Sequence, residues 1–216
     1  MCIYFLVTYA QQFMSNTYEK NESTSLLWLH NHKFMIRYRN LNIIQHASGA
    51  KNMLIRKMER EDAGPFLQML RQLDSEQKFM MYEPGERKTT VDEMGAHIER
   101  MNKSGSLILV AEADGIIAGF LSAERGFAQR IKHSAYIVVG VLKAHSNAGA
   151  GTRLFEELEK WALGSGITRL ELSVMCHNEK AIKLYKKAGY EIEGVKVKSL
   201  LVDGLYIDEY YMAKLI

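Results

Sequence analysis

Between residues 53 and 216 the apolar positions follow two periods, which predict alternating strands and helices. A repeat of two, or a short unbroken apolar run, marks each expected strand. These strands are residues 54–58, 106–113, 116–122, 135–142, 170–175, 190–193 and 205–212. A repeat of three or four marks four expected helices. They begin near Asp62, Thr90, Gly149 and Asn178.

Short local signals indicate where some of these elements start or turn. Thr90 and Glu93 form a capping box, which is typical of a helix N-terminus. Asp62 can cap the first helix, which runs to about residue 73 with Pro65 in its first turn. Asp-Gly at 114–115, between two apolar runs, predicts a β-hairpin.

The strand at 135–142 is β-branched and nearly all apolar, so we expect it to be buried on both faces. The helices near 149–163 and 178–189 flank the strand at 170–175. Strands and helices mixed around one hairpin indicate an α+β or α/β domain with a mixed central sheet.

Composition narrows the class of protein. The chain has 216 residues, 47% hydrophobic and 25% charged, which suits one globular domain with an appendage. No apolar run approaches the roughly 20 residues that span a bilayer. The two cysteines, Cys2 and Cys176, exclude a disulfide framework and a cysteine-built zinc site, and favour a reducing, cytoplasmic compartment.

The first 52 residues differ from the rest. They contain no Asp, no Pro and one Gly, but six of the nine Asn. They also carry the whole net charge of +3, so the body after residue 52 is neutral and needs no nucleic-acid partner. We expect a poorly ordered extension, or a start-site artefact with Met53 as the natural first residue. A docking extension is the third reading.

The turn at 146–152 is the first candidate for chemistry. It reads Ser-Asn-Ala-Gly-Ala-Gly-Thr and joins an apolar strand to an amphipathic helix, which is a usual setting for binding an anion. A Walker P-loop would need Lys and then Ser or Thr, and Arg153 does not supply this. A dinucleotide fingerprint would need a third glycine where Leu154 stands, which argues against a nucleotide-dependent oxidoreductase. A simple tight turn remains an alternative.

A second segment, residues 178–190, reads Asn-x-x-Ala-x-x-Leu-Tyr-x-x-x-Gly-Tyr. Together with the turn, it resembles the GNAT superfamily of acetyl-CoA-dependent N-acetyltransferases over about residues 53–216. The resemblance implies one N-acetyltransferase domain with a mostly antiparallel, twisted sheet flanked by helices on both faces. One position departs from the family pattern: Ser146 stands where the family usually has Arg or Gln, so a long pyrophosphate donor is lost. The adjacent His145 is a candidate substitute, and a solvated residue is the alternative.

The resemblance also implies site residues. The strand edge at 139–141 would bind the pantetheine arm, the turn would hold the pyrophosphate, and two positions of the last helix would contact the cofactor. The cofactor-binding residues are Val139, Gly140, Val141, Ser146, Asn147, Ala148, Gly149, Ala150, Gly151, Thr152, Asn178, Tyr185 and Lys187. Tyr185 would be the general acid that protonates the departing thiolate, since a phenol and a thiol have comparable pKa values. Packing of its ring is the alternative role.

The acceptor side is less defined. Glu124 and His133 are candidate bases for the attacking amine, and both could equally be solvated residues. Glu83 and Glu86 lie in a loop that, by resemblance, would receive a cationic substrate, although Pro-Gly between them also suits an ordinary turn. His97 and His177 have no partners at metal-ligand spacing, so no metal is expected.

These observations predict an enzyme that uses acetyl-CoA as cosubstrate and transfers its acetyl group to a primary amine by direct attack. The acceptor would be a small-molecule amine or a protein N-terminus, and a second copy of the chain is a further expected partner. Neither nucleic acid nor membrane is expected as a partner. The alternative function is a non-catalytic acyl-CoA-binding sensor or interaction module, which would not need the hydroxyl of Tyr185.

Overall fold

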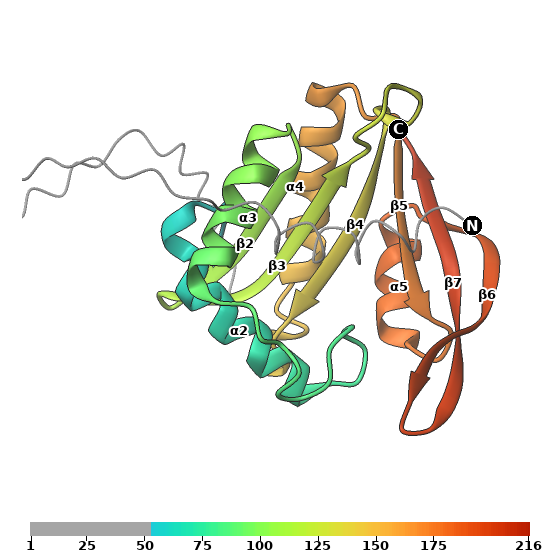
Figure 1. Cartoon of the computed structure of the whole chain (residues 1–216). Coiled ribbons are helices and arrows are strands. Elements are labelled where there is room, and N and C mark those ends of the chain that lie inside the picture. Colours follow the sequence, from blue (N-terminus) through green and yellow to red (C-terminus); the bar gives the residue numbers. More distant parts are fainter. Residues whose placement is uncertain (1–52) are drawn as a thin grey trace, which may run out of the picture. The chain divides into compact units, whose positions relative to one another are not determined.

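The computed structural model describes residues 53–216, which contain one seven-stranded sheet in the order β1-β2-β3-β4-β5-β7-β6 (Figure 1). The strands are β1 (Met53–Lys57), β2 (Leu107–Ala113), β3 (Ile116–Arg125), β4 (Ser134–Val141), β5 (Arg169–Met175), β6 (Glu191–Val202) and β7 (Leu205–Leu215). The helices are α2 (Ala63–Glu76), α3 (Val91–Lys103), α4 (Ala150–Ser165) and α5 (Glu179–Lys187). The predictions for residues 1–52 lie outside the described residues.

Every strand pair in this sheet is antiparallel except β4 with β5. The hairpin predicted at Asp114-Gly115 joins β2 to β3, and the capping box of Thr90 and Glu93 begins α3. The expected α+β class with a mixed, mostly antiparallel sheet is therefore confirmed.

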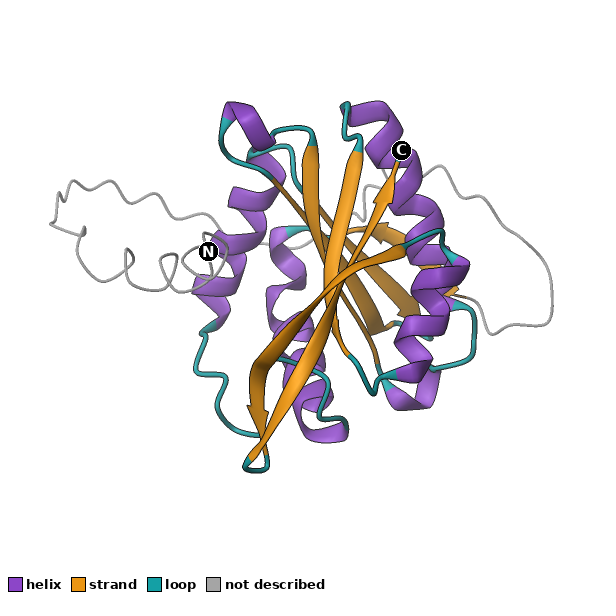
Figure 2. Cartoon of the chain, turned by 90° about the vertical axis from the view of Figure 1, so that its right-hand side faces the viewer, coloured by secondary structure: helices purple, strands orange, loops and turns teal. Residues whose placement is uncertain are grey.

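Helices cover both faces of the sheet (Figure 2). On one face α2 and α3 pack against β2 and β3, through residues such as Leu67, Ile98 and Phe120. On the other face α4 packs over the centre of the sheet through Leu154 and Leu158. Helices α2, α3 and α4 each bury the apolar stripe that the sequence period predicted.

The parallel pair β4–β5 is short. Only residues 134–136 pair with residues 169–171, whereas β4 continues to Val141 and β5 to Met175. Beyond Tyr136 the two strands separate, and α5 lies behind the opening in Figure 1. The second half of β4 therefore has a backbone edge that β5 does not use.

Three predictions about these elements are wrong. Strand 135–142 is not buried on both faces, because β4 loses its neighbour and Val138 is 40% exposed. Asp62 does not cap α2 with its side chain; its carboxylate binds Arg56 and accepts the N–H of Glu59. The strand expected at 190–193 is longer than predicted: β6 extends to residue 202 and pairs with β7 up to that point. No helix in residues 53–216 is both long and apolar enough to cross a membrane.

Candidate active site

The turn between β4 and α4 ends at a helix N-terminus without a side-chain cap. Asn147 and Gly149 both adopt left-handed backbone, with φ of 70° and 82°, and Gly149 is the N-cap residue of α4. Because Gly149 has no side chain, it leaves the first N–H groups of α4 available. The positive end of the helix dipole lies at the same place. The free N–H groups and the positive end of the helix dipole therefore make this turn suitable for binding an anion.

Glycine is needed at the two positions of this turn for different structural reasons. A Cβ atom on Gly149 would meet nothing within 4 Å, so the space in front of it is open. A Cβ atom on Gly151 would lie 2.8 Å from Cδ2 of Leu184 in α5. Gly149 therefore serves the backbone conformation and the open approach, whereas Gly151 lets α4 and α5 pack closely.

Side chains of the turn add little to this anion site. The hydroxyl of Ser146 donates to the carbonyl of Lys143 at 2.8 Å, within the turn itself. Arg153, in the first turn of α4, donates to the carbonyl of Met53 at 2.7 Å and is thus directed to β1. Lys143 is exposed and His145 is half-buried beside the turn. Backbone N–H groups are consequently the main donors that the turn offers.

The edge of β4 beyond Tyr136 carries the three residues expected to bind the pantetheine arm. Val139 and Val141 pack partly against the core under α4. A Cβ atom on Gly140 would lie 2.9 Å from Leu73 of α2 and 2.8 Å from Phe120 of β3, so this glycine is required by packing. Only the backbone of this stretch remains for recognition of a ligand.

Helix α5 presents Asn178 and Tyr185 behind the opening. The side chain of Asn178 accepts the N–H of Ala181 at 3.2 Å, so it caps the helix. The ring of Tyr185 is buried against Phe155 and Tyr190, with centroids at 5.7 and 6.3 Å. Burial, with a smaller effect of the nearby Tyr136, raises the pKa of Tyr185 well above its ordinary value. The phenol is therefore protonated near neutral pH and can donate. Lys187 is exposed on the same helix.

The α2 side of the opening carries a chain of hydrogen bonds that the sequence analysis did not find. Tyr136 shares a strand face with Gly140, which contacts α2. Its hydroxyl lies 2.8 Å from the hydroxyl of Ser173 in β5, which donates to the carboxylate of Glu209 in β7 at 3.2 Å. Glu209 is buried, and Ser199 of β6 also donates to it. These partners lie 10 to 37 residues apart in sequence, so no local pattern reveals them.

The loop between α2 and α3 crosses toward the β6–β7 hairpin on this side. Its Phe79 contacts the ring of His177 at 5.4 Å, and its Lys78 forms an ion pair with Asp203 in the hairpin turn. A buried ion pair of Arg87 with Asp74, at 2.8 Å, anchors the end of the loop to α2. The loop thus forms a wall beside the opening.

The predicted acceptor residues lie in three places. Glu83 and Glu86 are exposed in this loop, and the Glu86 carboxylate accepts the N–H of Glu83 at 2.9 Å. Glu124 of β3 pairs directly with Tyr136, so the two side chains share a face of the sheet. His133 is exposed at the closed end of the β4–β5 pair, where its carbonyl binds the N–H groups of residues 168 and 169.

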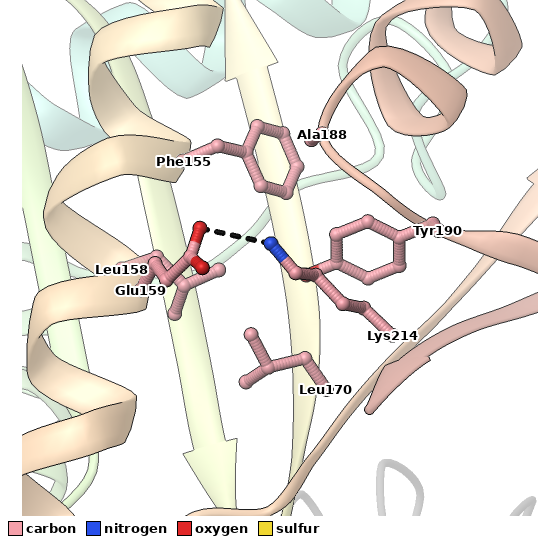
Figure 3. A pocket seen from close by; sticks show the side chains of 7 residues that line it. All are labelled: Phe155, Leu158, Glu159, Leu170, Ala188, Tyr190 and Lys214. Carbon is pink, nitrogen blue, oxygen red and sulfur yellow. Dashed lines mark hydrogen bonds and ion pairs between the residues drawn. The ribbon is translucent and has the colours of Figure 1, made fainter. Parts of the chain in front are cut away.

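A small pocket on the α4 side is too small for a cofactor. Figure 3 shows Glu159 and Lys214, paired at 2.8 Å, on either side of it with Tyr190 close by. Its volume of about 10 Å³ admits no more than one water. The hydroxyl of Tyr190 is buried here without a hydrogen-bond partner among the described residues. No cluster of three or more potential metal ligands occurs within residues 53–216.

Known proteins are similar to this chain in sequence and in fold. Residues 67–190 match the family model described as the acetyltransferase (GNAT) family. The L-amino acid N-acetyltransferase AaaT of Escherichia coli K12 is 36% identical over 117 residues, which cover 52% of this chain and 70% of that protein.

Solved structures agree in fold. A GNAT-family acetyltransferase from Streptococcus pneumoniae matches with a TM-score of 0.73 and 32% identity, over 76% of this chain and 99% of that one. The structure of yncA from Salmonella typhimurium with its cofactor acetyl-CoA matches with a TM-score of 0.68 and 21% identity, over 76% of this chain and 93% of that one.

Proposed function

The chain belongs to the GNAT family of acetyltransferases, and we propose that it transfers the acetyl group of acetyl-CoA to the primary amine of a small acceptor by direct attack. The observation that carries this proposal is the opening between β4 and β5. An uncapped helix N-terminus lies at the turn after β4, and the buried phenol of Tyr185 lies on the helix behind.

The donor would bind along β4. The N–H groups of residues 150–152 at the start of α4 would hold the pyrophosphate, with the turn residues 146–149 around it. The pantetheine arm would then follow the unpaired backbone edge at 139–141 as an added strand. This route leads the thioester toward Tyr136, where β4 and β5 meet. Asn178 and Lys187 on α5 would line the arm and the nucleotide end.

The reaction needs positioning, one acid and one base. Holding amine and thioester together supplies much of the rate, because it makes the attack effectively unimolecular. Tyr185 would protonate the thiolate as the C–S bond breaks. Burial raises its pKa, so the phenol keeps its proton until then, but it is a weaker acid than the free phenol whose pKa is comparable to that of a thiol. Glu124, which faces the same side as Tyr136, and His133 are the candidate bases from sequence.

We infer that the acceptor is an L-amino acid, with other small amines and protein N-termini as the alternatives. The support is the 36% identity to an L-amino acid N-acetyltransferase. Glu83 and Glu86 in the α2–α3 loop would face the ammonium of the incoming acceptor.

A thiol-release assay tests the proposal. Purified protein and acetyl-CoA are mixed with each of the standard L-amino acids, a polyamine and a peptide, and released CoA is measured with a thiol-reactive dye. We expect release with at least one L-amino acid, together with an acetylated product by mass spectrometry. The matching 2-hydroxy acid, which lacks the amine, is the control. Tight acetyl-CoA binding without release across the panel would favour the non-catalytic sensor instead.

A further inference from the structure

The chain of hydrogen bonds between Tyr136 and Glu209 has a defined direction. Ser173 has one hydroxyl proton, and it donates this proton to Oε1 of Glu209 at 3.2 Å. In the 2.8 Å contact with Tyr136, the hydroxyl of Ser173 must then be the acceptor and Tyr136 the donor. The lone pairs of the Tyr136 oxygen stay available for a further proton. The chain runs from a half-buried tyrosine to a buried carboxylate.

The half-buried end of this chain lies at the reacting end of the opening. Tyr136 is the last residue of β4 that pairs with β5, so it stands where the opening closes. It is also near enough to Tyr185 to affect that residue electrostatically, although Tyr185 belongs to the helix on the other face. In the proposed complex, the two phenols would lie on either side of the thioester of a β4-bound cofactor.

We propose that Tyr136, Ser173 and Glu209 form a relay that removes the first proton of the acceptor ammonium before it attacks. This inference rests on the proposed function. Tyr136 is the residue that touches the acceptor, whereas Glu209 and Ser173 act through it.

The protons balance along this path. The ammonium gives one proton to the Tyr136 oxygen while Tyr136 passes its own to Ser173 and Ser173 passes its own to Glu209. The free amine then forms the C–N bond, the C–S bond breaks, and Tyr185 gives its proton to the thiolate. The nitrogen loses its second proton to Tyr185. As the products leave, Glu209 returns the first proton through Ser173 and Tyr136 to solvent, which restores the starting state of the relay.

Charged and polar groups from β6 and from the end of β5 surround Glu209. Lys196 of β6 lies 3.6 Å from its Oε2, Ser199 of β6 donates to the same oxygen, and Cys176 follows β5 nearby. Oε2 is thus held from the β6 side, while Oε1 faces Ser173. The carboxylate is fixed in position, with one oxygen directed to the relay.

Two serines on the two oxygens of Glu209 provide a matched pair. Ser173→Ala removes a hydrogen bond to Glu209 and interrupts the path to Tyr136. Ser199→Ala removes a hydrogen bond to the same carboxylate and leaves the path continuous. If activity falls only because Glu209 is held less firmly, both variants should lose activity. If the relay is broken, only Ser173→Ala should lose activity.

The measurement is kcat/KM against pH, from about pH 6 to about pH 10, for the L-amino acid that the wild-type protein acetylates fastest. At neutral pH, we expect Glu209→Gln and Ser173→Ala to lose about 10²-fold or more, the usual range for acid–base catalysis. The loss should shrink toward high pH, where the amine is deprotonated in solution. Acetyl-CoA affinity should stay the same, and Ser199→Ala should keep the wild-type profile shape.

A second acceptor with a more acidic ammonium gives an independent test of the relay. The amide of the same amino acid has a more acidic ammonium, so where it reacts, its rate should fall less in both relay variants. A loss in Glu209→Gln and Ser173→Ala that is equal at every pH would overturn the relay and make Glu209 structural. An unchanged profile, or a change in Glu124→Gln in its place, would also overturn it. If Glu209→Gln does not fold, Ser173→Ala decides. A wild-type protein without activity on any amine would refute the proposed function, and the relay with it.

Discussion

Gly149 offers the sharpest test of the anion site, because it has a matched partner at the other end of the same helix. Gly149 is the N-cap and Gly166 the C-cap of α4, and both have left-handed backbone, with φ of 82° and 68°. A Cβ atom at either position would meet nothing within 4 Å. Alanine at either position should therefore cost stability only through its backbone conformation, about 1–2 kcal/mol. For a domain of this size, that lowers the Tm by roughly 2–8 °C.

The affinity for acetyl-CoA should distinguish substitutions at Gly149 from a substitution at Gly166. Gly149→Asn and Gly149→Asp have the same shape, and both tolerate left-handed backbone, so their Tm values should be close. Only Asp brings a negative charge to the place where the pyrophosphate would lie. At roughly 4–8 Å and an effective dielectric constant of about 20, this charge costs about 2–4 kcal/mol per phosphate charge. We expect the Kd for acetyl-CoA to rise about 30-fold or more from Asn to Asp, and Gly166→Ala to leave it unchanged.

Isothermal titration calorimetry at two salt concentrations measures this difference. The difference in Kd between the Gly149→Asn and Gly149→Asp variants should narrow at high salt, because the charges are near the surface and are screened. Equal affinities for the Asn and Asp variants in folded protein would show that the pyrophosphate does not bind at this turn. A similar loss in Gly166→Ala would instead trace the effect to the helix as a whole.

Two further residues give independent expectations. Tyr185→Phe keeps the ring contacts with Phe155 and Tyr190, so turnover should fall by about 10²–10⁴-fold while acetyl-CoA affinity stays constant; full turnover in this variant would remove Tyr185 as the acid. Burial, with help from the charge of Arg100, lowers the pKa of His97 below its ordinary value. Below about pH 6.5 the unfolded chain then binds a proton that folded His97 resists, so stability should fall with decreasing pH. Urea midpoints should show a flatter slope for His97→Gln, and an identical slope would contradict this account.

Local sequence signals predicted much of the fold and the glycine turn before α4. The capping box at Thr90, the Asp-Gly hairpin and the glycine turn each depend on neighbours within a few residues. Sequence order alone was sufficient for them because their chemistry is local. The length of β6 escaped prediction, because irregularities between Ile192 and Gly194 and between Lys196 and Leu200 interrupt its alternation.

The residues of the proposed relay could not be found in this way, because their contacts are not local. Tyr136, Ser173 and Glu209 lie on three strands that become neighbours only through the sheet order β4-β5-β7. Each is an unremarkable strand residue in sequence, and the contacts form over 36 and 37 positions. The apolar pattern did not predict the separation of β4 from β5 either, because strand pairing depends on partners that the pattern of one strand does not specify; only the resemblance implied a strand edge at 139–141. The prediction that β4 is buried on both faces failed for this reason.

The opening between β4 and β5 can persist because each strand is secured from its other side. β4 pairs with β3 over residues 119–125, and β5 pairs with β7 along its whole length. The three-residue parallel contact therefore joins two half-sheets that already hold together. Phe120 and Leu73 further fix β4 by packing against Gly140 from the α2 side. An unpaired strand edge is usually a liability, because its N–H and C=O groups invite another strand. Here the edge lies within the sheet, between β4 and β5, so a narrow amide-containing chain such as pantetheine would pair with it as an added strand.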